Sequence, residues 1–321
     1  MIEIGKDINK SIFHLKNNEI VALPTETVYG MGANALNKKS IVKIYKIKKR
    51  PFYDPLICHT NSINKIKKYV SKIPLKAKIL GETFWPGPLT ILFDKNKNIP
   101  DIVTSNLKRV AFRIPNNKLT LKVLEKLDFP IAAPSANPFG YISPTSPEHI
   151  MKKFETDIAY ILDDGDCNIG IESTIIGFEN NKTIIYRVGG ISIERIEKVI
   201  GKVHFFQKNI AFPNSPGMLK NHYSPEKKMI IGEIELLIKK YKNKKIGILS
   251  FNKYFDGVSK NNQIILSKKK CLIEASRNFY KSLHILDNMN IDVILSSLIP
   301  NKGIGKSIND RLIKASEKYE I

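Results

Sequence analysis

The stretch from Val21 to Thr60 constrains the fold of this chain more than any other. A strand-like apolar run, Ile20–Leu23, ends at Pro24, and a loop of threonines, a glutamate and a glycine follows it. A helix-like segment, Lys39–Lys49, then leads through a basic cluster into a second short strand. Rigid elements that carry polar loops are the usual support of a binding site. The stretch therefore predicts a site that holds a small polar substrate against a nucleotide.

The N-terminal part alternates between helix and strand patterns. Apolar residues at helical spacing predict helices over Asp7–Asn17, Lys39–Lys49, Asn61–Tyr69, Leu75–Phe84, Leu119–Leu127 and Ser192–Ile200. Short apolar and β-branched runs predict strands over Ile20–Leu23, Leu56–Cys58, Leu89–Phe93, Val110–Pro115, Pro130–Ala133, Ile158–Leu162, Ile175–Phe178 and Thr183–Val188. These elements indicate the α/β class.

The C-terminal part has a more regular alternation. Strands are predicted over Met229–Ile231, Ile246–Ser250, Gln263–Leu266 and Val293–Ser296, and helices over Glu233–Tyr241, Cys271–Asn288 and Ile308–Glu320. This order predicts a small, mainly parallel three-layer α/β domain. The preceding segment has no periodicity and is rich in proline, asparagine and serine, which indicates a linker or lid. We therefore predict domains at 1–200 and 228–321, with a linker at 201–227.

The formal net charge of the chain is +22, and it is spread through both halves. Many lysines stand in runs beside asparagine and isoleucine, such as Lys239–Lys245 and Lys268–Lys270. Such runs are consistent either with solvated faces or with a nucleic-acid surface, and the sequence leaves both open. In either case a positive field favours polyanionic ligands such as ATP or RNA.

Cysteine spacing and hydropathy indicate the cellular compartment of the protein. Cys58, Cys167 and Cys271 are far apart and match neither a disulfide framework nor a metal-binding pattern. The first residues include charges before any apolar run, unlike a signal peptide. No stretch approaches the roughly eighteen apolar residues that a membrane span needs. We therefore expect a cytoplasmic protein with no membrane partner.

Several familiar motifs are incomplete or absent in this sequence. Gly303–Ser307 ends like a phosphate-binding Walker A loop, but Pro300 stands where that motif needs its first glycine. The acidic loop Asp163–Asp166 lacks the downstream glutamate of a calcium loop. No serine-hydrolase elbow, zinc-protease motif or kinase set is present.

The remaining candidate site is rich in threonine, serine, lysine and arginine and has no evident covalent nucleophile. Its second polar cluster, Ser135–Ser146, is consistent with plain turns as well as with a binding loop. Arg113 stands inside an apolar strand and therefore needs a partner. This composition suits transfer at phosphorus, where positioning and charge neutralisation supply most of the rate.

Motifs along nearly the whole chain resemble those of the YrdC family. In the N-terminal part they are Pro24–Gly30, Lys48–Pro51, Pro55–His59, Pro86–Thr90, Arg113–Pro115, Ala133–Asn137 and Glu172–Ile175. The linker and second domain of two-domain members are similar to Ser215–Met218, His222–Pro225, Glu274–Asn278 and Ile308–Leu312. The resemblance implies a YrdC-like twisted open mixed sheet with helices as catalytic domain, plus a smaller Rossmann-like three-layer α/β C-terminal domain.

The resemblance also implies an activity. Members of this kind are nucleotidyltransferases that make L-threonylcarbamoyladenylate from L-threonine, bicarbonate (or CO2) and ATP, and release pyrophosphate. The product is handed to a tRNA threonylcarbamoyl transferase, which forms N6-threonylcarbamoyladenosine in tRNA. The resemblance also implies Mg²⁺, which is expected to enter through the ATP phosphates, and the sequence has no metal-binding side-chain motif.

Carried over motif by motif, the resemblance implies two groups of site residues. Threonine is expected to be held by Thr27, His59, Arg113, Ala133 through its backbone, and Ser173. ATP is expected to be surrounded by Lys48, Arg50, Asp54, Arg109, Ser135, Ser143, Arg187, His222 and Tyr223. Lys48 and Arg50 are the expected catalytic residues, since a basic cluster stabilises charge on leaving pyrophosphate.

Two residues depart from the family pattern. Asp54 stands where the family usually has asparagine, so an additional negative charge is expected near the phosphates. Lys49 stands between two basic residues, where glycine is common. Both departures predict altered nucleotide affinity and not a loss of activity.

Two other functions compete with this one. A double-stranded RNA- or tRNA-binding module without synthase activity is suggested by the charge of +22. RNA binding needs a basic and aromatic surface but no threonine-sized pocket, so hydroxyl-lined strand ends discriminate against it. A carbamoyl-transfer maturation domain resembles the first domain, but it belongs to longer chains with zinc-finger-like cysteines, which are absent here. Weak binding of tRNA is compatible with the synthase.

Overall fold

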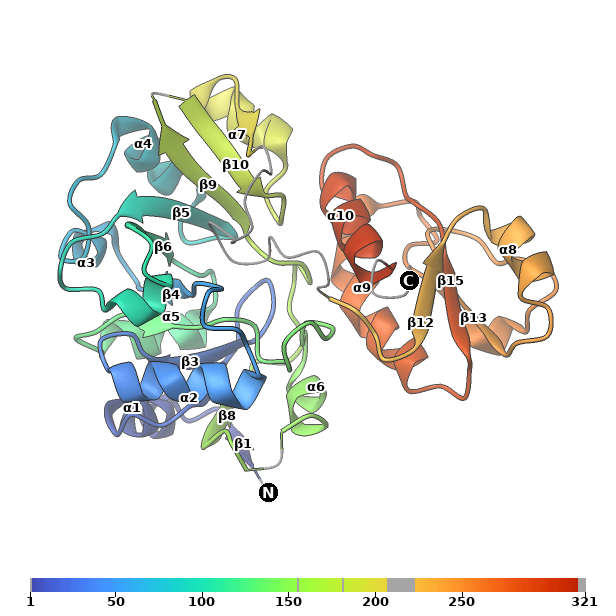
Figure 1. Cartoon of the computed structure of the whole chain (residues 1–321), viewed down its shortest axis with the longest axis horizontal. Coiled ribbons are helices and arrows are strands. Elements are labelled where there is room, and N and C mark those ends of the chain that lie inside the picture. The colour runs from blue at the N-terminus through green and yellow to red at the C-terminus, as the bar shows by residue number, and fades with distance from the viewer. Residues whose placement is uncertain (1, 155, 181, 207–222, 317–321) are drawn as a thin grey trace.

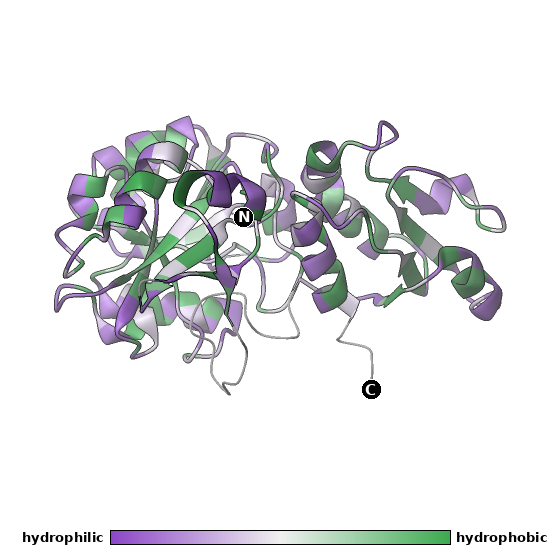
Figure 2. Cartoon of the chain, turned by 90° about the horizontal axis from the view of Figure 1, so that it is seen from above, coloured by the Kyte–Doolittle hydropathy of each residue, from purple (hydrophilic) through white to green (hydrophobic). Residues whose placement is uncertain are grey.

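The structure, a computed structural model, describes residues 2–154, 156–180, 182–206 and 223–316. A larger N-terminal domain and a smaller C-terminal domain lie side by side (Figure 1). In Figure 2 hydrophobic residues lie along the central strands, and the surrounding helices carry both hydrophobic and hydrophilic residues. Among the described residues, no helix has the length and apolar composition that crossing a membrane requires.

The N-terminal domain is organised around a mixed sheet. Its strands are β1 (Glu3–Gly5), β2 (Val21–Leu23), β3 (Gly30–Asn34), β4 (Ile57–His59), β5 (Leu89–Asp94), β6 (Arg109–Arg113), β7 (Ile131–Ala132), β8 (Tyr160–Leu162), β9 (Thr174–Glu179), β10 (Lys182–Arg187) and β11 (His204–Phe205). Over the described residues the sheet has 11 strands in the order β1-β8-β2-β3-β7-β4-β6-β5-β9-β10-β11. The sheet contains parallel pairs such as β4–β6 and antiparallel pairs such as β5–β6, so it is mixed, as expected.

Helices surround this sheet. They are α1 (Ile8–Lys16), α2 (Lys38–Lys48), α3 (Ile63–Ile66), α4 (Leu75–Phe84), α5 (Lys118–Glu125), α6 (Pro147–Met151) and α7 (Ile193–Ile200), with a short 3-10 helix, η1 (Asp101–Thr104). Side-chain caps set where four of them begin, because Asp7, Asn37, Ser62 and Asn117 each accept a hydrogen bond from a first-turn N–H group. The α2 helix ends at Lys49, whose backbone is left-handed with φ 52°. The chain therefore turns sharply toward β4 just after the basic end of α2.

The C-terminal domain is the predicted three-layer unit. Its strands are β12 (Lys228–Ile231), β13 (Ile246–Ser250), β14 (Gln263–Ile265) and β15 (Val293–Ser296), parallel to one another in the order β12-β15-β13-β14. Its helices are α8 (Ile234–Lys240), α9 (Leu272–Asp287) and α10 (Gly305–Ser316), with a short 3-10 helix, η2 (Lys260–Asn262). Apolar residues of α8 pack on one face of the sheet, and those of α9 and α10 pack on the other.

The main difference from the sequence prediction is β3, which was not expected. The sequence analysis placed these glycines in the polar loop after Leu23, whereas in the structure they belong to a crowded strand. A Cβ atom on Gly32 would lie 2.9 Å from Leu23 Cδ1 and 3.0 Å from Ile131 Cγ2, so only glycine fits between β2 and β7. The short β1 and β11 strands and the α6 helix were also missed. The helix expected over Asn61–Tyr69 covers only Ile63–Ile66.

The two domains meet where α9 and α10 face the N-terminal domain (Figure 1). Ser276 Oγ donates to Ile169 O at 2.8 Å, and Arg277 Nε donates to Asn168 O at 2.9 Å. Gly170 has φ 70°, and a Cβ atom there would lie 2.7 Å from the backbone of α9. The absence of a side chain at Gly170 therefore allows α9 to approach the segment that precedes β9.

Candidate active site

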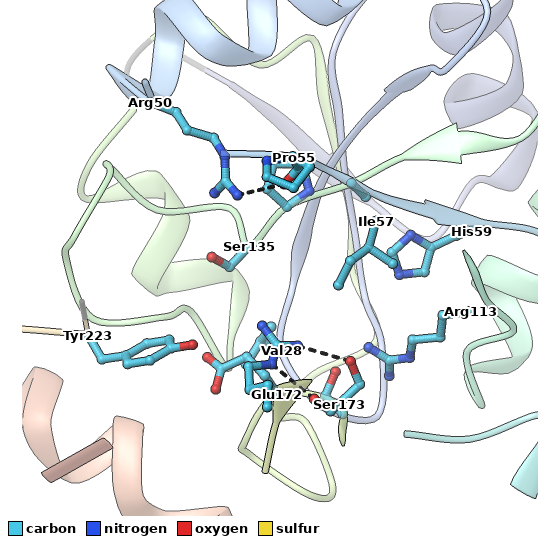
Figure 3. Close-up of a pocket in the computed structure, with 14 residues that line it drawn as sticks. Val28, Arg50, Pro55, Ile57, His59, Arg113, Ser135, Glu172, Ser173 and Tyr223 are labelled. Atoms are coloured by element: carbon cyan, nitrogen blue, oxygen red, sulfur yellow. Dashed lines mark hydrogen bonds between the residues drawn. The ribbon is translucent and has the colours of Figure 1, made fainter. Parts of the chain in front are cut away.

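Strand ends and the loops that follow them enclose a pocket at the centre of the N-terminal domain (Figure 3). The space inside the pocket, including the part open to solvent, is about 500 Å³. Its lining residues are Thr27, Val28, Arg50, Pro55, Ile57, His59, Arg113, Ala133, Pro134, Ser135, Glu172, Ser173, Arg187 and Tyr223.

The loop between β2 and β3 supplies Thr27 and Val28. Thr25 Oγ1 donates to Val28 O at 2.6 Å and accepts from the N–H groups of Thr27 and Val28 at 3.1 and 3.2 Å. These bonds close a tight turn of the kind that a threonine hydroxyl favours. The hydroxyl oxygens of Thr25 and Thr27 are 2.8 Å apart. Thr27 is therefore held by a rigid turn at the pocket wall.

His59 and Arg113 enter the pocket together because β4 and β6 pair in parallel with these two residues in register. Burial, and then the charge of Arg113, lowers the pKa of His59 to about 3, so the imidazole is neutral at physiological pH. Its buried Nδ1 atom has no hydrogen-bond partner among the described residues. A buried polar atom without a partner needs an explanation, and a bound ligand is one.

Arg113 has the partner that its position in an apolar strand predicted. Its Nη2 atom lies 2.8 Å from Glu26 Oε2 in an ion pair that is almost fully buried. The same carboxylate oxygen accepts from the backbone N–H of Asn116 at 3.0 Å. Glu26 belongs to the threonine-rich loop after β2, so this ion pair ties that loop to the end of β6.

Arg50 forms the opposite side of the pocket. Its Nε atom donates to Asp54 O at 3.0 Å, and Nη2 donates to Pro55 O at 2.8 Å. The Asp54 side chain is fully buried behind Arg50 and does not line the pocket. We expected its charge near the phosphates, whereas the structure places that charge on the far side of the guanidinium group. Burial raises the pKa of Asp54, while Arg50 and Lys48 oppose the rise.

Lys48 also lies behind the pocket wall. Its Nζ atom donates to Ser135 O at 2.5 Å and to Asn137 O. Burial, and then the neighbouring charge of Arg50, lowers its pKa well below the usual value. The structure thus attaches Lys48 to the backbone of the loop that presents Ser135, and this loop, rather than the Lys48 ammonium group, forms the wall.

Ser173 and Arg187 form a connected pair. The Arg187 Nη2 atom donates to Ser173 Oγ at 3.0 Å, and Nε donates to Ser173 O at 3.1 Å. The Ser173 hydroxyl also bonds the hydroxyl of Thr90, 2.7 Å away. Thr90 lies on β5 directly behind Ser173 and was not singled out in the sequence. Since β9 pairs with β5 on one side and with β10, which ends at Arg187, on the other, the sheet fixes all three side chains relative to one another.

Glu172 was not predicted to be a site residue, although it adjoins Ser173. Its Oε1 atom accepts from Ser143 Oγ at 2.7 Å, which places the predicted ATP residue Ser143 behind Glu172 and outside the wall. Burial opposes ionisation of Glu172, but Arg311, Arg187 and the Ser143 hydroxyl outweigh it, and the pKa is lowered. Glu172 is therefore a carboxylate.

Tyr223 is the last lining residue and comes from the segment that joins the domains. Its side chain is fully buried, and the guanidinium carbon of Arg311 lies 5.1 Å from its ring centroid. Figure 3 shows the Tyr223 hydroxyl directed toward Glu172 and the pocket. His222, the neighbouring predicted residue, lies outside the described residues.

Arg109 stands apart from the pocket. It begins β6, whereas Arg113 ends it, so their Cα atoms are about 13 Å apart along an extended strand. The Arg109 Nη1 atom donates to Tyr186 OH at 2.8 Å and lies 3.0 Å from Glu179 Oε1. The position of Arg109 favours a structural contact on the sheet surface over contact with a ligand in this pocket.

The structure thus brings together nine of the predicted residues. They are Thr27, Arg50, His59, Arg113, Ala133, Ser135, Ser173, Arg187 and Tyr223. The sequence analysis missed the apolar lining residues Val28, Pro55, Ile57 and Pro134, which carry no polar signal. It also missed Glu26, Thr90 and Glu172, whose roles depend on contacts between distant segments. In the described ranges no cluster of three or more His, Cys, Asp or Glu residues could hold a metal ion.

Comparison with known proteins agrees with this geometry. Residues 14–189 match the Sua5/YciO/YrdC family model, described as "Telomere recombination". Residues 191–317 match the model described as "Threonylcarbamoyl-AMP synthase, C-terminal domain". The chain is therefore similar to that family over both domains.

Individual relatives are similar over most of the chain. A threonylcarbamoyl-AMP synthase from Pyrococcus abyssi is 37% identical, with 94% of this chain and 92% of the relative covered. One from Bacillus subtilis is also 37% identical, with 94% and 90% covered. The crystal structure of P. abyssi Sua5 complexed with L-threonine superimposes with a TM-score of 0.92 at 36% identity, covering 99% of this chain and 98% of that one.

Proposed function

The chain belongs to the Sua5/YciO/YrdC family, and on this premise we propose that its pocket joins L-threonine, bicarbonate (or CO2) and ATP into threonylcarbamoyl-AMP. It is a two-domain member of the family, as its sequence motifs predicted. The reaction is a nucleotidyl transfer, and it supplies a step in the threonylcarbamoyladenosine modification of tRNA. The relatives bear the name of the synthase, so they do not support the alternative of an RNA-binding module without synthase activity.

One observation carries the proposal for the site. Three arginines, Arg50, Arg113 and Arg187, line one pocket together with the hydroxyl residues Thr27, Ser135 and Ser173. Guanidinium groups match the oxygens of carboxylates and phosphates, and hydroxyl groups match the hydroxyl and amine of threonine. A site of this composition suits two anionic substrates that must be placed against each other.

The threonine half of the proposed site is the side with Thr27, His59 and Arg113. Arg113 receives the carboxylate, since its ion pair with Glu26 holds the guanidinium group in place. The neutral His59 offers a ring nitrogen as hydrogen-bond acceptor without adding charge beside the substrate amine. Ser173 and the Ala133 backbone complete this half. The complex of P. abyssi Sua5 with L-threonine, at 36% identity, supports the assignment.

The ATP half is the side with Arg50, Ser135 and Arg187, closed by Tyr223. Arg50 is held by backbone carbonyl groups and by Asp54, so it faces the phosphates without reorganisation. We keep Arg50 as a catalytic residue that stabilises charge on the leaving pyrophosphate. Lys48 contributes by fixing the Ser135 loop. His222 remains part of the proposal from its motif alone.

The reaction requires two bond-forming steps. The threonine amine attacks the carbon of CO2 and releases a proton, or it attacks the carbon of bicarbonate, whose C–OH bond breaks so that the hydroxyl and the amine proton leave as water; either route gives a carbamate. A carbamate oxygen then attacks the α-phosphorus of ATP, the bond from that phosphorus to the bridging oxygen breaks, and pyrophosphate leaves. No covalent bond to the protein is needed, so the work of the site is to position the substrates and neutralise charge.

We propose that Mg²⁺ enters with the nucleotide. The described residues offer no cluster of metal ligands, and the Glu172 carboxylate in the pocket wall is already bonded to Arg311. The residues present therefore fit a cation that is held mainly by phosphate oxygens. Bound in this way, Mg²⁺ supplies charge neutralisation on the polyphosphate.

Two further proposals concern the surroundings of the reaction. We place it in the cytoplasm, where three cysteines without disulfide partners, Cys58, Cys167 and Cys271, are stable. The product passes to a tRNA threonylcarbamoyl transferase, because a mixed anhydride of this kind hydrolyses in water. The net charge of +22 supports weak binding of tRNA during that transfer.

The test is direct. The protein is incubated with ATP, bicarbonate and labelled threonine, and the threonine-dependent adenylate and pyrophosphate are measured. We expect both products with the wild type and a strong loss in Arg50→Ala and Ser173→Ala, while Arg109→Ala, at the other end of β6, stays active. Absence of product from the wild type contradicts the function, and full activity of the Arg50 and Ser173 variants contradicts the site.

A further inference from the structure

Glu172 has contacts that cross the boundary between the domains. It is the one carboxylate that lines the pocket, as far as the described residues show. The Tyr280 hydroxyl of α9 lies 2.9 Å from both of its oxygens, and Arg311 Nε of α10 donates to Oε2 at 3.0 Å. Burial and the Glu172 charge raise the pKa of Tyr280 well above its usual value, so that hydroxyl keeps its proton and donates it. The C-terminal domain therefore reaches the pocket wall directly.

Helix α10 also holds the strand end that carries Arg187. Arg311 Nη1 donates to Val188 O at 2.7 Å, and Ser307 Oγ donates to Gly189 O at 2.9 Å. Arg311 thus bonds to Glu172 on one side and to the residue after Arg187 on the other. Its guanidinium carbon also lies 5.1 Å from the ring of Tyr223, a third pocket residue.

The charges of Glu172 and Arg187 explain why the contacts from α9 and α10 affect the pocket. Arg187 donates to the side chain and carbonyl of Ser173, and no hydrogen bond joins Arg187 to Glu172 in the described part of the chain. Glu172 is close enough to shift the pKa of Arg187, which burial lowers. If Glu172 lost its partners on α9 and α10, Arg187 would be the nearest cation in the pocket wall able to pair with it. Arg187 would then be less available to an anionic ligand.

We propose that Arg311 and Tyr280 of the C-terminal domain are positioning residues of the active site, which hold the Glu172 carboxylate so that Arg187 stays available to the anionic nucleotide. The proposal rests on the synthase function and adds a role for the second domain. It differs from a purely structural role, in which the same contacts only keep the domains together. A structural role predicts changes in stability alone, whereas a positioning role predicts changes in nucleotide affinity.

The experiment compares variants of the full-length protein. Tyr280→Phe removes one hydroxyl group and keeps the ring, so it is the variant expected to fold best. Arg311→Gln removes the charge, and the double variant Glu172→Gln/Arg311→Gln removes both partners. Lys281→Gln is the control, since Lys281 neighbours Tyr280 on α9 and forms an exposed interdomain ion pair with Asp166 at 2.6 Å. ATP and threonine binding are measured by calorimetry, and kcat, KM and Tm are measured alongside.

We expect weaker ATP binding and a higher KM for ATP, by about tenfold in Tyr280→Phe and by more in Arg311→Gln. Threonine affinity should change less, because Arg113 and His59 lie on the other side of the pocket. The double variant should recover ATP affinity to within about threefold of wild type, since no free carboxylate remains to compete for Arg187. Lys281→Gln should match the wild type.

Two results would overturn the proposal. One is a lower Tm in Tyr280→Phe and Arg311→Gln with ATP affinity and KM unchanged. The other is a double variant that binds ATP no better than Arg311→Gln. Because ATP binding is measured without turnover, these results are distinct from a failure of the wild type to form product, which would instead contradict the proposed function.

Discussion

Arg50 Nη2 lies 2.8 Å from Asp54 Oδ2, and both side chains are almost completely excluded from water. The two residues are four positions apart, in the turn between α2 and β4. Arg50 lines the pocket, whereas Asp54 lies behind it. The ion pair therefore orients the guanidinium group and at the same time offsets part of the positive charge that it presents to a ligand.

Asp54→Asn should strengthen ATP binding. Asparagine keeps the shape of the side chain, and the bonds from Arg50 to the carbonyl groups of Asp54 and Pro55 do not depend on the carboxylate. Removing one negative charge next to Arg50 should lower the KM for ATP by about threefold to tenfold. Steady-state kinetics at varied ATP concentration measure the change. A higher KM would show that the carboxylate acts mainly by fixing Arg50.

Lys48→Met should destabilise the protein and weaken the site indirectly. Methionine keeps much of the length, but the carbonyl groups of Ser135 and Asn137 lose their buried donor. We expect a loss of about 2 kcal/mol or more in unfolding free energy and a higher KM for ATP. Thermal unfolding with kinetics provides the check. An unchanged Tm with a large drop in kcat would instead place the Lys48 ammonium group on the substrate.

Thr90→Val should impair catalysis although Thr90 does not line the pocket. Valine keeps the shape and removes the hydroxyl that bonds Ser173 at 2.7 Å, so Ser173 and Arg187 lose a fixed position. We expect kcat/KM to fall by about tenfold. Thr183→Val is a matched control, because Thr183 is a buried strand residue whose hydroxyl has no hydrogen-bond partner among the described residues. That variant should stay active and be more stable by about 1 kcal/mol. Equal activity of the two variants would contradict the role of Thr90.

The domain interface should be sensitive to acid. His149 and His284 stack across it with ring centroids 3.8 Å apart, and burial lowers the pKa of His149 to about 4 and of His284 to about 3, from an ordinary value of 6.5. Below pH 6.5 the unfolded chain binds these protons and the folded chain does not. Stability is therefore full above pH 6.5 and falls as the pH drops toward 4, by up to about 1.4 kcal/mol per pH unit for each imidazole.

Denaturant unfolding at pH 7 and pH 4.5 tests this prediction. The wild type should lose stability between the two values, and the double variant His149→Gln/His284→Gln should lose clearly less. His14→Gln is a suitable control, since His14 lies on α1, away from the domain interface, with its Nδ1 atom 2.6 Å from Glu19 Oε2. A pH response that is the same in the wild type and in the double variant would exclude the stacked pair as its source.

Much of the fold and part of the site could be predicted from the sequence. The periodicity of the C-terminal strands predicted β13 and β15 to the residue, since buried parallel strands are uninterrupted apolar runs. The helical spacing of apolar residues predicted α1 within one residue at each end. The strand β3 was missed because its glycines are required by the close approach of neighbouring strands. The local sequence does not show which strands will be neighbours. For the site, the family motifs indicated Ser173, and Thr90 stands in one of them, Pro86–Thr90, but the sequence alone assigned Thr90 no role.

The sequence by itself determined the classes of element, the two-domain order and the polar loops that carry the chemistry, because these depend on periodicity and on short motifs. Only the tertiary structure decided which side chains face the pocket and which lie behind it. Lys48 and Asp54 belong to the same basic turn as Arg50, yet Arg50 alone lines the wall. Glu172 became part of the site through Arg311, which is 139 residues away along the chain. Burial and charge pairing between distant segments decide which side chains face the pocket. A local sequence pattern contains no information on either.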